Sequence, residues 1–323
     1  MSELLDILLE KRGITAEQKD IFLNPDYKRD LHDPFLMRDM EKACVRLYEA
    51  IENKEKIIIY ADYDCDGIPG AVILVDLLKM LGVPFEVYPH TKDFSVGVYI
   101  PQRNSEGYGL NMEAIEKFAE SGVKLLITID LGITALAEVA QAEVNDIDVI
   151  ITDHHLPPDT LPRAFAILNP KVDGYPGKMP ARNASGIADA GGLCGAGVMF
   201  KFAQGFLKKY GEYFKIKEGA EKWMLDMAGL ATLSDMVPLT GENRAIACFG
   251  MKVLKKTPRP GLQKLLAKMN IDQRHLSEDD IGFMVTPRLN AASRMDNPMR
   301  AFELLATEDE VEGGVLADHL SKI

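Results

Sequence analysis

The sequence predicts an α/β fold, a doubly wound and mostly parallel sheet with helical additions at both ends. Three observations lead to this class. Short apolar runs of strand type alternate with helix-type segments between about residues 53 and 192. The pattern beyond about residue 192 is helical only, and a further helical segment precedes the first strand. Strands that alternate with helices form βαβ units, and such units build parallel sheets.

The predicted sheet begins with residues 56–61, KIIIYA, whose isoleucines are typical of a buried strand. A helix should follow over residues 69–81, because Pro69 suits a first turn and Gly82 a helix end. The later elements, in chain order, are a strand over 85–88, a helix over 111–120, a strand over 124–129, a helix over 134–144, and strands over 148–152 and 164–168.

We therefore expect three parts: an N-terminal helical segment (1–52), an α/β domain (53–192) and a helical part (193–323) that completes the core. The alternative is a separate helical subdomain after about residue 192. The helices expected there cover residues 193–210, 218–233, 242–256 and 261–268.

Composition favours a cytoplasmic protein. Hydrophobic residues make up 47% of 323 residues, no run of about 18 apolar residues predicts a membrane span, and the acidic N-terminus lacks the features of a signal peptide. The four cysteines are far apart and form no CxxC pair, which indicates thiols in a reducing compartment. They are Cys44, Cys65, Cys194 and Cys248.

Net charge at pH 7 is −12, which argues only weakly against a polyanionic substrate, because the charge is unevenly distributed. Residues 251–300 contain ten Lys and Arg against five Asp and Glu, a net +5 that leaves −17 for the remainder.

Acidic residues and histidines follow three of the predicted strands. They are Asp62, Asp64 and Asp66 after the first, Asp130 after the third, and Asp153, His154 and His155 after the fourth. Ligands of open parallel sheets bind beyond the carboxyl ends of the strands, so these groups should meet at one edge. Their mutual repulsion would be relieved by divalent cations, and carboxylates with a minority of His suit Mn²⁺ or Mg²⁺ better than structural zinc.

Each motif alone has an ordinary structural explanation, namely a solvated acidic turn, a helix cap, or a capping Asp beside surface histidines. Their combination at successive strand ends favours a metal site. An EF-hand is excluded, because Val75 occupies the twelfth loop position counted from Asp64, where calcium loops carry Glu.

Four short motifs follow one another along the chain: DYDCDG at 62–67, Asp130 before Gly132-Ile133, the Asp-His-His triplet at 153–155, and Asp235 in ATLSDMVPL. Together they resemble the DHH phosphoesterases, and most closely the RecJ single-stranded-DNA-specific exonucleases. Further similar stretches are PQRNSEGYG around Arg103, LCGAGVMFKF at 193–202 and PRLNAASRM at 287–295. The resemblance covers roughly residues 40–320.

The resemblance implies a site for two divalent cations, normally Mn²⁺, with Mg²⁺ as the alternative. The implied ligands are Asp64, Asp66, Asp130, His154 and Asp235, with Asp130 bridging both ions and Asp62 as an additional ligand. Asp130, His154 and His155 are the implied catalytic residues; His155 either ligates or contacts the scissile phosphate, and Asp153 orients the adjacent histidine. From the pattern alone, Asp235 is a turn residue before Val237-Pro238.

The implied reaction is hydrolysis of single-stranded DNA from the 5′ end to 5′-mononucleotides, with water activated by two metals. Single-stranded DNA is thus the expected partner, with a single-stranded-DNA-binding protein or a helicase as candidate protein partners and no membrane. Arg103, Arg288 and Arg294 are candidates for the 5′-phosphate, because guanidinium matches phosphate oxygens, and Asn290 and Ser293 would add hydrogen bonds. A surface salt bridge is the alternative for each Arg.

The chain departs from this family in several places. RecJ-like enzymes carry a second domain beyond a connecting helix, with a glycine- and histidine-containing motif; this sequence ends at Ile323 and has no GGH, which puts grip on long strands in doubt. Cys65 stands where Ala is usual and Leu131 where Cys is usual, but no ligand position is lost. The glycine-rich segment 191–197 would either cradle a phosphate or pack a helix start near the metal site.

Two other functions remain open. A relative that cleaves short oligonucleotides, cyclic dinucleotides or pyrophosphate would need no second domain. A non-catalytic RecJ-like replication accessory protein would keep the fold and lose ligands, whereas this sequence retains every expected ligand position.

Overall fold

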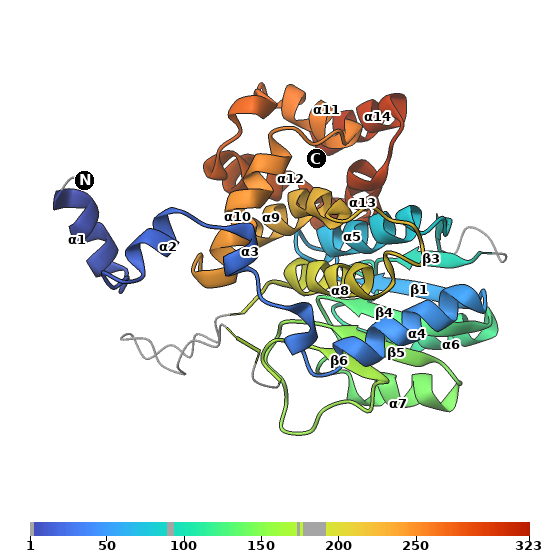
Figure 1. The fold of residues 1–323 in the computed structure, drawn as a ribbon. Coiled ribbons are helices and arrows are strands. Elements are labelled where there is room, and N and C mark those ends of the chain that lie inside the picture. Colours follow the sequence, from blue (N-terminus) through green and yellow to red (C-terminus); the bar gives the residue numbers. More distant parts are fainter. Residues whose placement is uncertain (1–2, 89–93, 173–174, 177–191) are drawn as a thin grey trace.

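Six parallel strands form one sheet in the order β2-β3-β1-β4-β5-β6 in the computed structural model, which describes residues 3–88, 94–172, 175–176 and 192–323 (Figure 1). The strands are β1 Lys56–Ala61, β2 Phe85–Val87, β3 Val96–Tyr99, β4 Val123–Ile129, β5 Asp148–Thr152 and β6 Ala166–Leu168. The predicted doubly wound parallel sheet is confirmed. The order reverses at β1, whose neighbours are β3 and β4, so the chain leaves β1 toward one edge and later builds toward the other.

β3 has no counterpart among the strands predicted from the sequence. Its residues are interrupted by Gly97, which breaks the apolar run expected of a buried strand. The glycine is required by packing, because a Cβ there would lie 2.7 Å from Ile58 Cδ1 and 3.1 Å from Tyr88 Cβ. The other predicted strands lie within two residues of their observed bounds.

Helices cover both faces of the sheet. One face is covered by α4 (Met40–Glu52), α5 (Gly67–Met80) and α8 (Gly195–Tyr210), and the other by α6 (Met112–Glu120) and α7 (Leu136–Val144) (Figure 1). Side chains of β1 alternate accordingly, because successive strand residues point to opposite faces. Ile57 and Ile59 enter the first core and Ile58 and Tyr60 the second.

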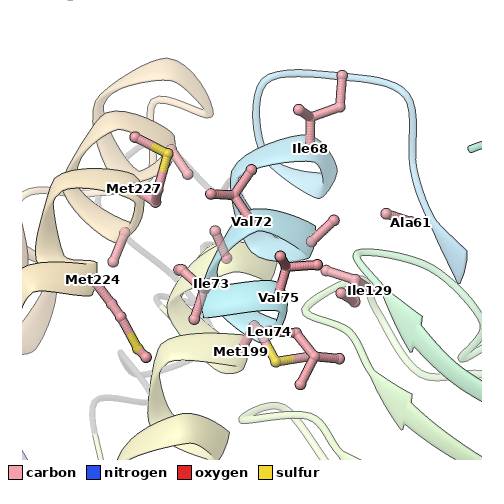
Figure 2. Packing of buried hydrophobic residues seen from close by; sticks show 14 of the residues in the cluster. Ala61, Ile68, Val72, Ile73, Leu74, Val75, Ile129, Met199, Met224 and Met227 are labelled. Carbon is pink, nitrogen blue, oxygen red and sulfur yellow. The ribbon is translucent and has the colours of Figure 1, made fainter. Parts of the chain in front are cut away.

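The larger core lies around α5, which is buried along almost its whole length. Figure 2 shows Val72 and Ile73 of this helix on the side of Met224 and Met227. Leu74 lies beside Met199, and Val75 lies beside Ile129. Because α5 contacts both the sheet and the C-terminal helices, its position is fixed from two sides. Its first turn therefore has a defined place at the carboxyl end of β1.

The helical remainder packs on α5 and α8. It comprises α9 (Leu225–Ser234), α10 (Gly241–Leu254), α11 (Pro260–Lys268), α12 (Thr286–Met295), α13 (Met299–Ala306) and α14 (Glu310–Leu320). The last three were not predicted, and residues 218–233 form a 3-10 helix (Ala220–Met224) followed by α9 rather than one helix. A π-helical turn, Asp280–Val285, leads directly into α12, which has Pro287 in its first turn.

The N-terminal segment is helical, as predicted. It contains α1 (Glu3–Lys11), α2 (Lys19–Leu23), α3 (Tyr27–Asp30) and a 3-10 helix, Pro34–Leu36, before α4. The first two helices extend away from the body of the protein (Figure 1). Among the helices of the described residues, none has the length and apolar character needed to cross a membrane.

Candidate metal centre

The turn after β1 brings three carboxylates to the carboxyl edge of the sheet. Asp62 N donates to Ile129 O, which prolongs the pairing of β1 with β4 by one residue. Asp64 Oδ1 then accepts from the backbone N–H groups of Asp66 and Gly67 at 2.8 and 3.1 Å, and this turn starts α5. Gly67 is required here, because a Cβ would lie 2.4 Å from Asp62 O.

Asp66 is held by the first turn of α8. Gly195 N donates to Asp66 Oδ2 at 2.6 Å, and Ala196 N to Asp66 Oδ1 at 2.7 Å. A carboxylate is favoured at a helix N-terminus, where backbone N–H groups have no partner within the helix. The glycine-rich segment therefore packs a helix start against the acidic cluster, as one of its two interpretations predicted; Gly191 lies outside the described residues.

Asp130 has a left-handed backbone with φ of +63°. Its N–H continues the ladder of β4 with β5 by donating to Thr152 O at 2.8 Å, and Gly132 then completes the turn with φ of +111°. Left-handed geometry costs a non-glycine residue stability, although Asp tolerates it better than most, and such strain is common at functional sites. A Cβ on Gly195 would lie 2.5 Å from Asp130 Cβ, so the backbone at the start of α8 packs directly against the Asp130 side chain.

In the triplet after β5, Asp153 contacts backbone N–H groups and the His155 ring, whereas His154 lies among the carboxylates. Asp153 is buried and accepts from the backbone N–H groups of Ile133, His154 and His155. Its Oδ1 also lies 2.7 Å from His155 Nδ1, which fixes the orientation of that ring. Burial raises the pKa of Asp153, but these hydrogen bonds outweigh it and the pKa is lowered overall. Of the two histidine rings, the one that Asp153 contacts is that of His155.

His154 lies at the centre of the cluster. Its Nε2 is 3.1 Å from Asp130 Oδ1 and 3.6 Å from Asp66 Oδ2, and its Nδ1 is 3.8 Å from Asp235 Oδ2. Asp235 caps the C-terminus of α9. Met236 follows it with φ of +57°, so the chain turns away immediately after the carboxylate.

The described residues thus form three overlapping groups whose members offer one ligand atom each, all within 4.8 Å of one another. They are Asp62 with Asp64 and Asp130, Asp66 with His154 and Asp235, and Asp130 with His154 and His155. Every residue expected to ligate metal belongs to at least one group. Asp130 and His154 each belong to two of the three groups, so they connect neighbouring groups.

Comparison with known proteins agrees with this geometry. Residues 56–232, more than half of the chain, match the family described as "DHH family, N-terminal domain". The chain belongs to the DHH family. Its sequence is 37% identical to the single-stranded-DNA-specific exonuclease RecJ of Bacillus subtilis (strain 168) over 326 residues, which cover all of this chain and 37% of that protein. The chain therefore spans less than half the length of this relative.

Two solved structures have a similar fold. A crystal structure of exonuclease RecJ bound to manganese matches with a TM-score of 0.74 and 29% identity, over 90% of this chain and 67% of that chain. RecJ from Thermus thermophilus in complex with Mn²⁺ matches with a TM-score of 0.74 and 27% identity, over 97% of this chain and 40% of that chain.

The donor set of this DHH-family chain fits divalent cations. Asp62 Oδ1 and Asp130 Oδ1 are buried and have no hydrogen-bond partner among the described residues, although His154 Nε2 lies close to the latter. Burial raises the pKa of Asp62 to about 7 and that of Asp235 to about 7, and neighbouring carboxylates add to both shifts. Burial beside Asp66 likewise raises the pKa of Asp130 well above its usual value. Cations would remove the repulsion that these shifts express.

The predicted substrate residues have different environments. The Arg103 guanidinium lies over the Tyr63 ring, 5.3 Å from its centroid, at the side of the carboxylate turn. Asn290 Oδ1 accepts from Cys65 N at 2.8 Å, so it holds that same turn. Arg288 donates to Met284 O within its own helical segment, and Ser293 is buried with its hydroxyl on Asn290 O.

Arg294 is exposed on α12, and no contact in the described part of the chain connects it to the carboxylates. Cys65 is buried.

Sequence reasoning gave Tyr108 and Lys171 no role in the site. The Tyr108 hydroxyl lies 3.5 Å from His155 Nε2 and 3.5 Å from Asp130 O. Lys171 lies close enough for its charge to lower the pKa of Asp235. Tyr108 had one signal in the sequence, its place five residues after Arg103, whereas nothing near Lys171 pointed to the cluster.

Proposed function

We propose that the chain binds two divalent cations at this cluster, with Mn²⁺ preferred over Mg²⁺. Support comes from the two buried carboxylate oxygens that lack a hydrogen-bond partner among the described residues and from the manganese in two related structures. One ion would be held by Asp62, Asp64 and Asp130, and the other by Asp66, His154 and Asp235. Asp130 would serve both, because its Oδ1 lies 3.1 Å from His154 Nε2. These five carboxylates more than balance the charge of two dications, and neutral imidazole completes the set.

The activity proposed for this site is hydrolysis of single-stranded DNA from its 5′ end, releasing 5′-mononucleotides. The family and its RecJ relatives support this substrate. When bound, the cations supply Lewis-acid activation of water and neutralise charge on the phosphate oxygens. The observation that carries the proposal is that Asp130 groups with Asp62 and Asp64 on one side and with His154, a member of the group that contains Asp66 and Asp235, on the other. Two neighbouring ion positions are what phosphodiester hydrolysis by two metals requires.

The chain's own residues would orient the substrate. Asp153 fixes His155 through Nδ1 and raises its pKa, which favours the protonated ring. In that form Nε2, 3.5 Å from the Tyr108 hydroxyl, would donate to a phosphate oxygen. Arg103, supported by the Tyr63 ring, is in our proposal the guanidinium that receives the terminal 5′-phosphate. Arg288 and Arg294 would contact the phosphates next to the terminal one along the DNA strand. Asn290 would act on the turn that carries Asp64 and Asp66, the metal-binding turn, rather than directly on DNA.

A time course with a 5′-phosphorylated single strand tests the proposal. Mn²⁺ should support stepwise loss of mononucleotides, chelator should stop it, and Asp130→Ala should lack activity with either Mn²⁺ or Mg²⁺. Turnover that continues unchanged in chelator contradicts the mechanism. A parallel assay with a dinucleotide decides the substrate class: faster cleavage of the dinucleotide would favour the short-oligonucleotide alternative.

We also propose a cytoplasmic location and a single-stranded-DNA-binding protein or a helicase as protein partner. The first rests on four separate cysteines, all free thiols, which suit a reducing compartment. The second rests only on the substrate, because such proteins hold or generate single strands. Binding of the purified chain to each partner, with and without DNA, tests the second proposal.

A further inference from the structure

The metal-binding ends of α5 and α9 are one end of an antiparallel helix pair. Asp66 immediately precedes α5 and Asp235 immediately follows α9, and both offer ligand atoms to the same group with His154. The two helices pack against each other through apolar side chains, with Val72 and Ile73 of α5 facing Met227 of α9 (Figure 2).

Two further carboxylates mark the opposite end of this pair. Asp76 lies ten residues after Asp66, about 15 Å along α5, and Asp226 lies nine residues before Asp235, about 14 Å along α9. Both are largely buried, with side-chain exposures of 17% and 3%. Unpaired, two carboxylates so placed would repel each other and separate the helices.

Arg259 binds both carboxylates. Its Nε donates to Asp226 Oδ2 at 2.7 Å and one terminal nitrogen also donates to Asp76. The other terminal nitrogen donates to Leu305 O at 3.1 Å, and Thr257 Oγ1 donates to Asp226 Oδ2 at 2.7 Å. The guanidinium is only 12% exposed, so water screens these charges weakly.

We propose that Arg259 is a positioning residue for the ion held by Asp66, His154 and Asp235. It ties α5 to α9 at the end remote from the site and thereby sets the separation of Asp66 and Asp235 at the other end. Asp62, Asp64 and Asp130 follow β1 and β4 rather than α9, so the other ion position should be affected less. The inference rests on the proposed function, because it assumes a pair of ions.

Arg259→Met tests the inference, because methionine fills similar volume without charge or donors. Arg46→Met is a matched control. Arg46 is also a buried guanidinium with two carboxylate partners, Asp148 at 2.6 Å and Glu55 at 2.7 Å, but it lies at the amino end of β5, the edge of the sheet opposite the cluster. Both variants lose a buried guanidinium that binds two carboxylates, but only Arg259 contacts residues of α5 and α9.

The readouts are manganese titration by calorimetry and the electron paramagnetic resonance spectrum, both without DNA. Wild type and Arg46→Met should bind two Mn²⁺ per chain and give a spin-coupled spectrum. In Arg259→Met the second Mn²⁺ should bind roughly 10- to 100-fold more weakly, as for other residues that orient metal ligands, and the spectrum should be that of a single uncoupled ion.

Arg259→Lys serves if the methionine variant does not fold, because it keeps a cation but cannot reach both carboxylates with a planar fork. It should weaken the second ion in the same direction by a smaller factor. Two wild-type-like Mn²⁺ sites in either Arg259 variant, or equal weakening in Arg46→Met, overturn the positioning role. A wild-type chain that binds no pair of ions overturns the proposed function as well, so the two failures are distinguishable.

Discussion

Asn290 Oδ1 accepts a hydrogen bond from Cys65 N at 2.8 Å, although the two residues are 225 positions apart in the chain. The bond fixes the backbone between Asp64 and Asp66, two of the proposed metal ligands. A side chain on α12 therefore supports the candidate ligands that follow β1. This relationship distinguishes two functions for Asn290, one on the metal-binding turn and one on DNA.

Asn290→Ala should lower affinity for Mn²⁺ even without DNA, by roughly 10-fold, because the Cys65 N–H loses its acceptor and the turn is no longer held. Calorimetric titration of the free protein measures this effect. If Asn290 instead acts only on the substrate, Mn²⁺ affinity will equal that of wild type and only the KM for DNA will rise.

Asp130→Asn should abolish binding of the ion pair yet raise the melting temperature of the metal-free protein by a few degrees. The buried Asp130 carboxylate is crowded by Asp66, Asp64 and Asp62, so its charge destabilises the metal-free fold. Asparagine removes that charge and tolerates the left-handed backbone that Asp130 adopts.

Thermal unfolding in chelator, and again with added Mn²⁺, measures both effects. Wild type should gain stability on Mn²⁺ addition and the variant should not. A variant less stable than wild type in chelator contradicts the electrostatic account of Asp130.

The strand-end motifs were predictable because topology alone brings them together. In a parallel sheet the residues after β1, β4 and β5 must share an edge, so Asp64, Asp130 and His154 could be grouped from strand assignment. Asn290 and Gly195 were not predictable in this way. Their roles depend on how α12 and α8 pack on the sheet, and the spacing of residues in the sequence does not encode such long-range contacts.

Asp235 illustrates the same limit. The pattern alone made it a turn residue, and it became a candidate ligand only through the family resemblance. The structure explains both interpretations, because Asp235 does end α9 before a turn, and α9 packs on α5 so that this end meets Asp66 and His154.

Stability of the metal-free protein should fall as pH rises from about 4 to about 7. Burial raises the pKa of Asp62 and of Asp235 from 3.8 to about 7, so each takes up a proton on folding within this range. The stability that protonation of these two carboxyl groups gives the folded state is complete at pH values below their pKa in the unfolded chain. It is lost as pH rises through their pKa in the folded protein. Chemical denaturation in chelator at several pH values measures the slope, which should be smaller in Asp235→Asn.

Manganese affinity should change in the opposite direction and increase up to about pH 7, because the ions bind deprotonated carboxylates. Titration with Mn²⁺ at about pH 6 and about pH 8 checks this, since the two values lie on either side of the raised pKa. Equal affinity at the two values would mean that Asp62 and Asp235 are already ionised at the lower pH or do not bind metal.

Gly195→Ala should remove most Mn²⁺ binding while leaving the fold intact. The added Cβ would lie 2.5 Å from Asp130 Cβ and 2.7 Å from Asp130 Oδ1, so either Asp130 or the start of α8 must move. Movement of α8 would in addition break the hydrogen bonds from Gly195 N and Ala196 N to Asp66. We expect affinity to fall by roughly 100-fold, the upper range for residues that orient metal ligands.

Gly314→Ala is the matched control, since Gly314 lies within α14 with open space around its Cβ position. That substitution should leave Mn²⁺ affinity unchanged and slightly raise the melting temperature, because alanine restricts the unfolded chain. Mn²⁺ affinity in Gly195→Ala equal to that in Gly314→Ala would mean that α8 can retreat without disturbing Asp130 or Asp66.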